Sequence, residues 1–203
     1  MTSSQISINQ IVSSFMGKEY ELNNTPYYPN LFGIRSKENI PNAFNDLIGA
    51  IYYNGTTWDM LLVEGTTDAG LYWQQNPMNV NGTAVIIPGQ YKNCYKVGLH
   101  TGYKAYQQVG VMNYIRDNNK DKVLDLLYKV VGFKKYREIA ATNLHHASNT
   151  STSSVVDKWS AGCQVVAGIV NFGKLLGLGE RWVTLNPTKN LFNYTLFEEQ
   201  DIK

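Results

Sequence analysis

The sequence predicts a mainly β fold with a few helices, of the α+β class. Two Asn-Gly pairs, at Asn54-Gly55 and Asn81-Gly82, border stretches rich in β-branched and aromatic residues. An Asn-Gly pair in this setting is the strongest local signal for a β-hairpin turn. Fourteen tyrosines and four tryptophans also favour strands. With 203 residues, 43% of them hydrophobic, we expect one domain over residues 1–203 with a sizeable core.

Two helices are expected outside the strand-rich centre. Apolar residues recur at helical spacing from Ile8 to Met16 and predict a helix over about residues 3–17, capped by Ser3 or Ser4, that packs on the domain. Residues 117–119 resemble a helix cap, and the apolar residues over 123–131 predict a second helix that Gly132 closes.

Strands are expected over most of the middle of the chain. They cover residues 48–53 and 56–62 around the first Asn-Gly turn, residues 83–87 after the second, and then 95–100, 103–111 and 112–116. This half of the chain predicts a β-meander or a barrel-like sheet. A helix-like apolar segment is expected after Cys163, up to Leu178, and two more strands over 181–185 and 193–197.

Composition excludes several classes of function. A net charge of +2 with no stripe of Lys or Arg argues against a nucleic-acid partner. Residues 1–10 lack the basic and apolar regions of a signal peptide, and no apolar run has the roughly 18 residues of a membrane span. We therefore expect a protein that is made in the cytoplasm. We also expect a monomer.

The candidate site is a histidine and a cysteine on either side of a polar loop. His145 precedes Cys163 by 18 positions, and Ser, Thr and Asn crowd the segment between them. An accessible thiol with an imidazole in reach is the arrangement that a cysteine nucleophile needs. We expect Cys163 to be the nucleophile, held as a thiolate by His145 and by the start of the following helix. Ser160 and the backbone N–H groups at Gly162 and Cys163 are expected to hold the oxyanion.

Other residues are candidates for substrate binding. His100 lies between glycines and is expected in an exposed turn beside the groove. His146 is expected to point away from His145, as successive strand residues do, and to be a loop residue in contact with solvent. Tyr103 and Trp159 are aromatic side chains of the type that binds sugars or peptides. Cys94, in a Tyr-rich strand, is expected to be a small buried residue.

The order and spacing of these residues resemble the L,D-transpeptidase (YkuD-type) family. His145 matches the upstream His of that family, and Ser160 to Cys163 matches its Ser-His-Gly-Cys box. Pro88 to Tyr91 is similar to its Pro-x-Gly-x-Phe/Tyr element but is one residue shorter. The sequence departs from the family at Ala161, which replaces the second His, and after Cys163, where the Arg is missing. The resemblance covers about residues 86–166.

Four longer phrases resemble a bacteriophage-type branch of the same superfamily; these are Gly33-Ile34-Arg35, Thr67-Asp68-Ala69-Gly70, His100-Thr101-Gly102-Tyr103 and Trp159-Ser160-Ala161-Gly162-Cys163-Gln164-Val165.

The resemblance implies an L,D-transpeptidase-like β-sandwich or half-barrel that forms a single catalytic domain without a cofactor. Its partners would be peptidoglycan stem peptides, which it would attack through a thioester on Cys163. Hydrolysis is favoured over transfer, as in an endolysin or virion-associated lysin that reaches the cell wall through a holin or in the virion. One alternative is an L,D-transpeptidase that forms or exchanges cross-links. Another is a non-catalytic virion structural or glycan-binding protein on the same fold.

Two further interpretations have less support. His100, Cys163 and Arg181 occur in the order found in sortases, but the Thr-Leu-x-Thr-Cys motif is missing. The second is a zinc site made of His100, His145, His146 and Cys163. Adjacent histidines on a strand are poor co-ligands, and no His-x-x-x-His or Cys-x-x-Cys spacing is present, so no metal is expected.

Overall fold

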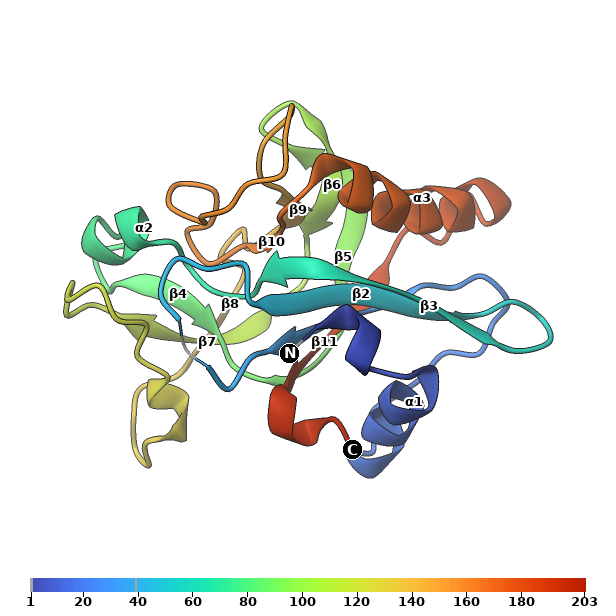
Figure 1. The fold of residues 1–203 in the computed structure, drawn as a ribbon, viewed down its shortest axis with the longest axis horizontal. Helices are drawn as coiled ribbons and strands as arrows, with labels where there is room; N and C mark the ends of the chain where they lie inside the picture. The colour runs from blue at the N-terminus through green and yellow to red at the C-terminus, as the bar shows by residue number, and fades with distance from the viewer. Residues whose placement is uncertain (1, 39) are drawn as a thin grey trace.

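The fold is mainly β with a few helices, as the sequence predicts (Figure 1). The structure is a computed structural model that describes residues 2–38 and 40–203. Within these residues, eight strands close into a barrel in the order β1-β11-β5-β6-β9-β10-β3-β2. Their bounds are β1 (Asn30–Arg35), β2 (Asp46–Tyr53), β3 (Trp58–Thr66), β5 (Gly89–His100), β6 (Tyr103–Gln108), β9 (Leu144–His146), β10 (Gln164–Val166) and β11 (Phe192–Glu198).

A small three-stranded sheet stands beside the barrel and is not part of it. It has the order β4-β7-β8, from β4 (Thr83–Ile86), β7 (Met112–Asp117) and β8 (Tyr136–Glu138). The chain leaves the barrel between β6 and β7, where the N–H groups of Val109 and Gly110 both donate to the carbonyl of Cys94, at 2.8 and 3.1 Å. The sequence predicts one continuous meander here, whereas this turn separates the barrel strands from β7 of the small sheet.

The first Asn-Gly hairpin is confirmed. β2 and β3 pair antiparallel from Asp46↔Gly65 to Tyr53↔Trp58. Asn54 closes the turn, because its N–H donates to the Thr57 carbonyl at 3.0 Å and its Oδ1 accepts from the N–H of Thr57 at 2.9 Å.

The N-terminal helix is also confirmed, but it starts later than the sequence predicts. Residues Ser3–Gln5 form a separate 3-10 turn, and α1 runs over Ile8–Gly17 with Ser7 as its cap. Ser7 Oγ accepts from the N–H of Gln10 at 3.3 Å, and the Gln10 side chain accepts from the N–H of Ser7 at 2.9 Å. Ile11 and Phe15 of α1 are buried against the barrel strands, so the helix packs on the domain.

The predicted helix over residues 117–132 is wrong. Asp117 is the last residue of β7, and the rest of this segment is irregular apart from a 3-10 turn at Leu127–Lys129. Its acidic side chains bind nearby backbone N–H groups: Asp121 Oδ1 accepts from Val123 at 2.9 Å, and Asp117 Oδ2 accepts from Asp125 at 3.1 Å. Such local bonds compete with the helical ones, and the segment packs instead on β4 and β7 through Leu124.

The predicted strand over residues 181–185 is wrong as well. These residues are the last turns of α3 (Ile169–Leu185). The helix buries Phe172, Leu175 and Trp182 on one face, at intervals of three to seven residues. A Cβ at Gly179 would meet the Tyr106 hydroxyl at 2.4 Å. The glycine therefore lets this helix lie directly on β6. The predicted strand at residues 193–197 is confirmed as part of β11.

Two of the four phrases quoted above, those that contain Arg35 and Thr67-Asp68, meet at one end of the barrel in a buried polar network. Arg35 is buried, and its Nε lies 2.9 Å from Asp68 Oδ1 and 3.1 Å from Thr67 Oγ1. Asp46 Oδ2 accepts from the Thr67 N–H at 2.7 Å. These contacts connect the ends of β1, β2 and β3, because buried charges need close partners. Their role in the fold is to fix the barrel end from which α2 (Leu71–Gln75) departs.

Candidate active site

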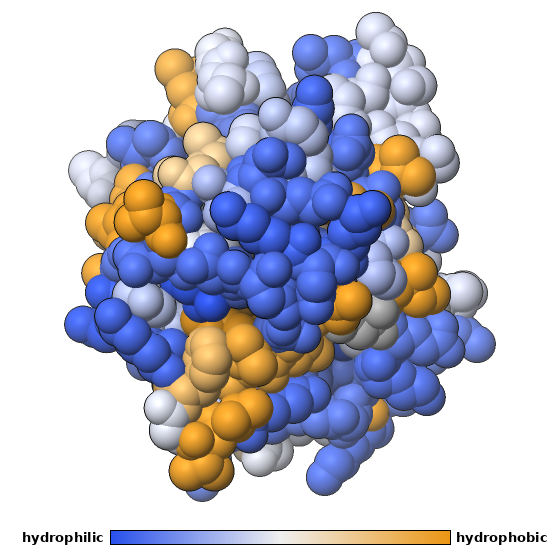
Figure 2. Space-filling view, turned by 90° about the vertical axis from the view of Figure 1, so that its left-hand side faces the viewer, coloured by the Kyte–Doolittle hydropathy of each residue, from blue (hydrophilic) through white to orange (hydrophobic). Residues whose placement is uncertain are grey.

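A cavity of about 740 Å³ opens on the side of the molecule that carries α2 and the small sheet. Figure 2 faces this side and shows orange hydrophobic patches among blue hydrophilic side chains. Four predicted site residues line the cavity, namely Cys163, His145, His100 and Trp159. Several exposed apolar side chains lie at its rim, including Met78, Leu99, Ile139 and Trp159.

Cys163 lies at the start of a barrel strand, and not at the start of a helix as we expected. β10 begins at Gln164 and pairs with β9 in parallel, with Val165 opposite His145. α3 begins only at Ile169. The cysteine therefore has no helix N-terminus to favour its thiolate. The parallel pairing is what brings the two predicted catalytic residues onto neighbouring strands.

Gly162 and Ser160 shape the turn that presents Cys163. Gly162 has φ +116°, and a Cβ there would meet the Ala84 carbonyl oxygen at 2.6 Å. The missing side chain thus admits the backbone of β4. Ser160 Oγ donates to the Cys163 carbonyl at 2.8 Å and accepts from the Gly162 N–H at 3.2 Å.

The oxyanion role expected for Ser160 and Gly162 needs correction. Both groups already have partners within the turn, and neither residue lines the cavity. The N–H of Cys163 itself forms no hydrogen bond with any residue that the structure describes. It is the backbone donor that remains for a developing oxyanion.

His145 is held in one orientation and one tautomer. Its Nδ1 lies 2.8 Å from the His146 carbonyl oxygen and 3.1 Å from the Tyr103 hydroxyl. Because a carbonyl oxygen only accepts, Nδ1 carries the proton, and Nε2 keeps a lone pair. Nε2 is buried and has no partner among the described residues. His145, which lines the cavity, therefore keeps one basic nitrogen without a partner among the described residues.

Burial keeps both catalytic candidates neutral. Burial raises the pKa of the Cys163 thiol to about 11, an effect that the Asn143 backbone partly opposes. Burial, and next the neighbouring His100, lower the pKa of His145 to about 3. The structure thus favours a thiol beside a neutral imidazole, and not the thiolate–imidazolium pair that the sequence suggested. The Cys163 Sγ donates weakly to the Ala141 carbonyl at 3.7 Å.

His100 supports His145 from the neighbouring hairpin. It is the last residue of β5 and not a turn residue, and its ring stacks on that of His145 with centroids 4.0 Å apart. The Asn143 amide nitrogen lies 2.9 Å from His100 Nδ1, while Asn143 Oδ1 accepts from the Gln108 N–H at 2.8 Å. Since an amide nitrogen only donates, His100 Nδ1 accepts. Burial lowers the pKa of His100, so both stacked rings are neutral.

His146 and Tyr103 lie behind the cavity wall. His146 is buried, not in contact with solvent as we expected, and its ring packs on Phe172 and Tyr103 with centroids 5.3 and 4.5 Å away. Tyr103 does not line the cavity, but its hydroxyl lies 3.1 Å from Nδ1 of His145, which does. Cys94 is fully buried, as predicted, and burial raises the pKa of its thiol.

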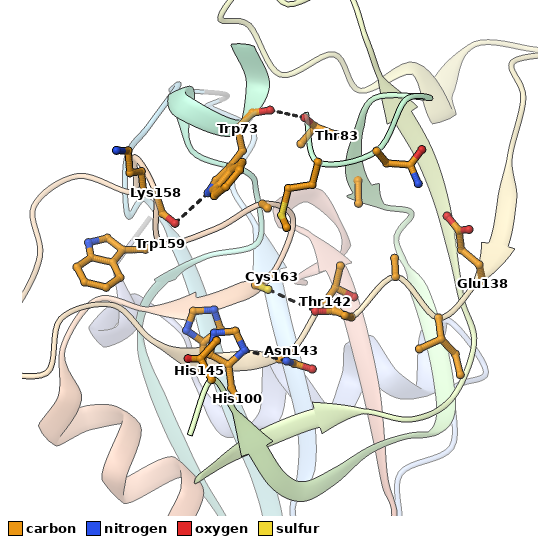
Figure 3. Close-up of a pocket in the computed structure, with 18 of the residues that line it drawn as sticks. Trp73, Thr83, His100, Glu138, Thr142, Asn143, His145, Lys158, Trp159 and Cys163 are labelled. Carbon is orange, nitrogen blue, oxygen red and sulfur yellow. Dashed lines mark hydrogen bonds between the residues drawn. The ribbon is translucent and has the colours of Figure 1, made fainter. Parts of the chain in front are cut away.

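The cavity also contains residues that the sequence analysis did not single out. Trp73 of α2 donates from its indole to the Lys158 carbonyl at 2.9 Å and forms one wall. In Figure 3, Trp159 and Glu138 lie on opposite sides of Cys163. Glu138 forms an ion pair with Arg116, another lining residue. These residues come from α2, β7 and β8, whose assembly around Cys163 has no local signal in the sequence.

Comparisons of the chain with protein-family models, curated proteins and solved structures returned no match. The likeness to L,D-transpeptidases therefore depends on the short sequence motifs described above. Within residues 2–38 and 40–203, no helix is long and apolar enough to cross a membrane. Across the same residues, no group of three or more His, Cys, Asp or Glu side chains is placed to hold a metal ion.

Proposed function

We propose that this protein is a cysteine-dependent peptidase of peptidoglycan, of a phage lysin type, that cleaves stem peptides or cross-links. The observation that carries the proposal is that Cys163 and His145 line the same cavity. The free, buried Nε2 of His145 supports it further, because a general base needs an unoccupied lone pair. Access to the cell wall would come through a holin or by transport in the virion.

The geometry supports a general-base mechanism. The thiol turns from the Ala141 carbonyl towards His145, whose Nε2 takes the proton as Sγ bonds to the substrate carbonyl carbon. The Cys163 N–H donates to the resulting oxyanion. The imidazolium then gives its proton to the leaving amine, the C–N bond breaks and a thioester remains. Water then attacks the thioester carbonyl carbon while Nε2 accepts a proton from it. The C–S bond breaks, the imidazolium returns this proton to Sγ, and the carboxylic acid product leaves.

The shape of the cavity supports cleavage within a chain. Cys163 lies between Trp159 on one side and Glu138 on the other (Figure 3). A substrate bound across the thiol would thus extend in both directions. This arrangement suits a stem peptide that continues past the reacting bond, or a cross-link between two stems, better than a single terminal residue.

The test is mass spectrometry of purified peptidoglycan fragments after incubation with the protein. We expect new peptide ends with the native protein and none with Cys163→Ala or His145→Ala. The double variant should be no worse than either single one, because the pair acts as a unit. Cys94→Ser is the matched control and should retain activity. The assignment would be reversed if Cys94→Ser were inactive and Cys163→Ala active.

Hydrolysis and transfer differ only in what attacks the thioester. An amine held near the thioester competes with water, and its effective concentration decides the outcome. We expect a labelled tetrapeptide stem to release free tripeptide, with or without an added D-amino acid. Quantitative exchange of the D-amino acid with little hydrolysis would instead identify an L,D-transpeptidase.

A second candidate is a peptidoglycan-binding protein, structural or glycan-binding, without turnover. The raised pKa of Cys163 and the alanine at position 161 favour it, since both leave the thiol without support for its anion. This alternative predicts equal binding of peptidoglycan by the native protein and Cys163→Ala, with no new fragments from either.

A further inference from the structure

One wall of the cavity that contains Cys163 carries an arginine. Arg116 of β7 lines the cavity, and its side chain is only 8% exposed. Glu138 of β8 lines the cavity too, with 37% of its side chain exposed, and the two form an ion pair. This wall of the cavity therefore carries a nearly buried cation, Arg116, beside a partly exposed anion, Glu138.

The ion pair lies close to the nucleophile through a short chain of contacts. Arg116 is directly opposite Ala84 in the β4–β7 pairing, so their side chains share one face of the small sheet. Gly162 packs against that same face, because a Cβ on it would lie 2.9 Å from the Cβ of Ala84. Cys163 is the next residue. The face of the small sheet that carries Arg116 therefore also contacts the turn at Gly162, directly before Cys163.

Both members of the pair retain unused hydrogen-bonding groups. A guanidinium has five N–H donors. Among the described residues, Arg116 uses two of them, one to Glu138 Oε1 and one to the Gly82 carbonyl at 3.3 Å. In the same part of the chain Glu138 uses only Oε1, which leaves Oε2 free. Donors for a carboxylate and an acceptor for an ammonium thus belong to two paired residues that line the cavity.

We propose that Arg116 and Glu138 form a subsite for an α-amino acid zwitterion, that is, an ammonium and a carboxylate on one carbon. This inference rests on the proposed function and specifies its substrate: a stem peptide whose diamino acid ends in such a group, as diaminopimelate does and lysine does not. The substrate carboxylate binds the free N–H groups of Arg116, and its ammonium binds Glu138 Oε2. In this arrangement each charge of the zwitterion lies beside an opposite charge of the protein. A ligand with only a positive or only a negative charge would also lie beside one side chain of the same charge.

The experiment measures binding without turnover. Calorimetry with Cys163→Ala compares three synthetic tripeptide stems that carry diaminopimelate, its side-chain amide, or lysine at the third position. We expect the diaminopimelate stem to bind at least tenfold more tightly than the other two. Glu138→Gln should reduce this preference to less than threefold. Arg116→Lys, which keeps the charge but loses the forked donors, should weaken carboxylate recognition.

A matched control is the exposed ion pair between Lys104 and Glu180, whose nitrogen and oxygen lie 2.7 Å apart and which does not line the cavity. Glu180→Gln in the Cys163→Ala protein should leave the preference unchanged. Thermal unfolding of every variant confirms that it is folded. The inference is overturned if the lysine stem binds as tightly as the diaminopimelate stem, if Glu138→Gln keeps the preference, or if no stem binds.

Failure of this inference and failure of the proposed function give different results. Cleavage of both stem types at equal rates would support the peptidase and refute the zwitterion subsite. Selective binding of the diaminopimelate stem without any cleavage by the native protein would support the subsite and refute the peptidase.

Discussion

The protonation state of Cys163 gives the sharpest test of the site, and alkylation of the thiol measures it. Burial raises the pKa of Cys163 to about 11, and His145 is not among the groups that shift it. Iodoacetamide reacts with the thiolate, so the labelling rate follows the ionised fraction. We therefore expect the rate to increase about tenfold for each pH unit from pH 7 to pH 10.

The size of the effect follows from the shifted pKa. At pH 8 a thiol with the ordinary pKa of about 8.5 is roughly one-quarter ionised, whereas one with a pKa of about 11 is ionised to roughly 0.1%. The more basic thiolate is about tenfold more nucleophilic, from a Brønsted slope of roughly 0.45. Labelling of Cys163 should then be roughly twentyfold slower than labelling of an exposed cysteine peptide.

The assay is intact-mass measurement of the Cys94→Ser protein after timed labelling at a series of pH values. His145→Ala in the same background is the decisive comparison. If the resting pair is neutral, His145→Ala should leave the pH profile of Cys163 unchanged within about threefold. A rate that is already high and flat at pH 6–7, and that His145→Ala abolishes, would refute our reasoning and show a thiolate–imidazolium pair.

Three further predictions concern stability, each measured as the free energy of unfolding in denaturant. Gly162→Ala should destabilise the protein by about 2–4 kcal/mol, because its Cβ would lie 2.6 Å from the Ala84 carbonyl oxygen and φ at this position is +116°. A loss below about 0.5 kcal/mol, which is the usual range for surface substitutions, would contradict this prediction. Arg35→Met should cost about 3–5 kcal/mol, since Asp68 then loses its buried partner; an unchanged midpoint would show that the network is dispensable. The pKa of His145 is about 3 in the folded protein, against 6.5 in the unfolded chain. The unfolded chain therefore binds a proton first as the pH falls. The contribution of His145 to stability is thus present above pH 6.5 and is lost as the pH falls towards 3. The protein should therefore lose about 2 kcal/mol between pH 7 and pH 5 from this group, and His145→Gln should remove that part of the slope.

Local patterns in the sequence determined the elements whose formation depends on neighbouring residues. The turn at Asn54-Gly55 and the apolar spacing of α1 are examples, because turn chemistry and an amphipathic face require no distant partner. The mainly β class followed from many such signals. Spacing in the chain also marked His145 and Cys163 as the candidate pair, and the structure places both in one cavity.

Local patterns misled where distant contacts decide between two conformations. Residues 117–132 have the apolar content of a helix, but aspartate side chains bind the backbone and Leu124 packs on the small sheet. Residues 181–185 have the composition of a strand, but they extend the face that α3 buries on the barrel. In both segments, burial against other elements outweighs a weak intrinsic preference.

The chemistry of the site depends on the tertiary structure. The sequence alone shows that a thiol and an imidazole are available. Only the parallel pairing of β9 with β10 sets them on neighbouring strands, and only burial gives the thiol its high pKa and the imidazole its free Nε2. The Arg116–Glu138 wall likewise exists only because a separate sheet folds against the cysteine turn. The pKa of a group and the identity of its neighbours depend on residues far apart in the chain, and no local pattern encodes them.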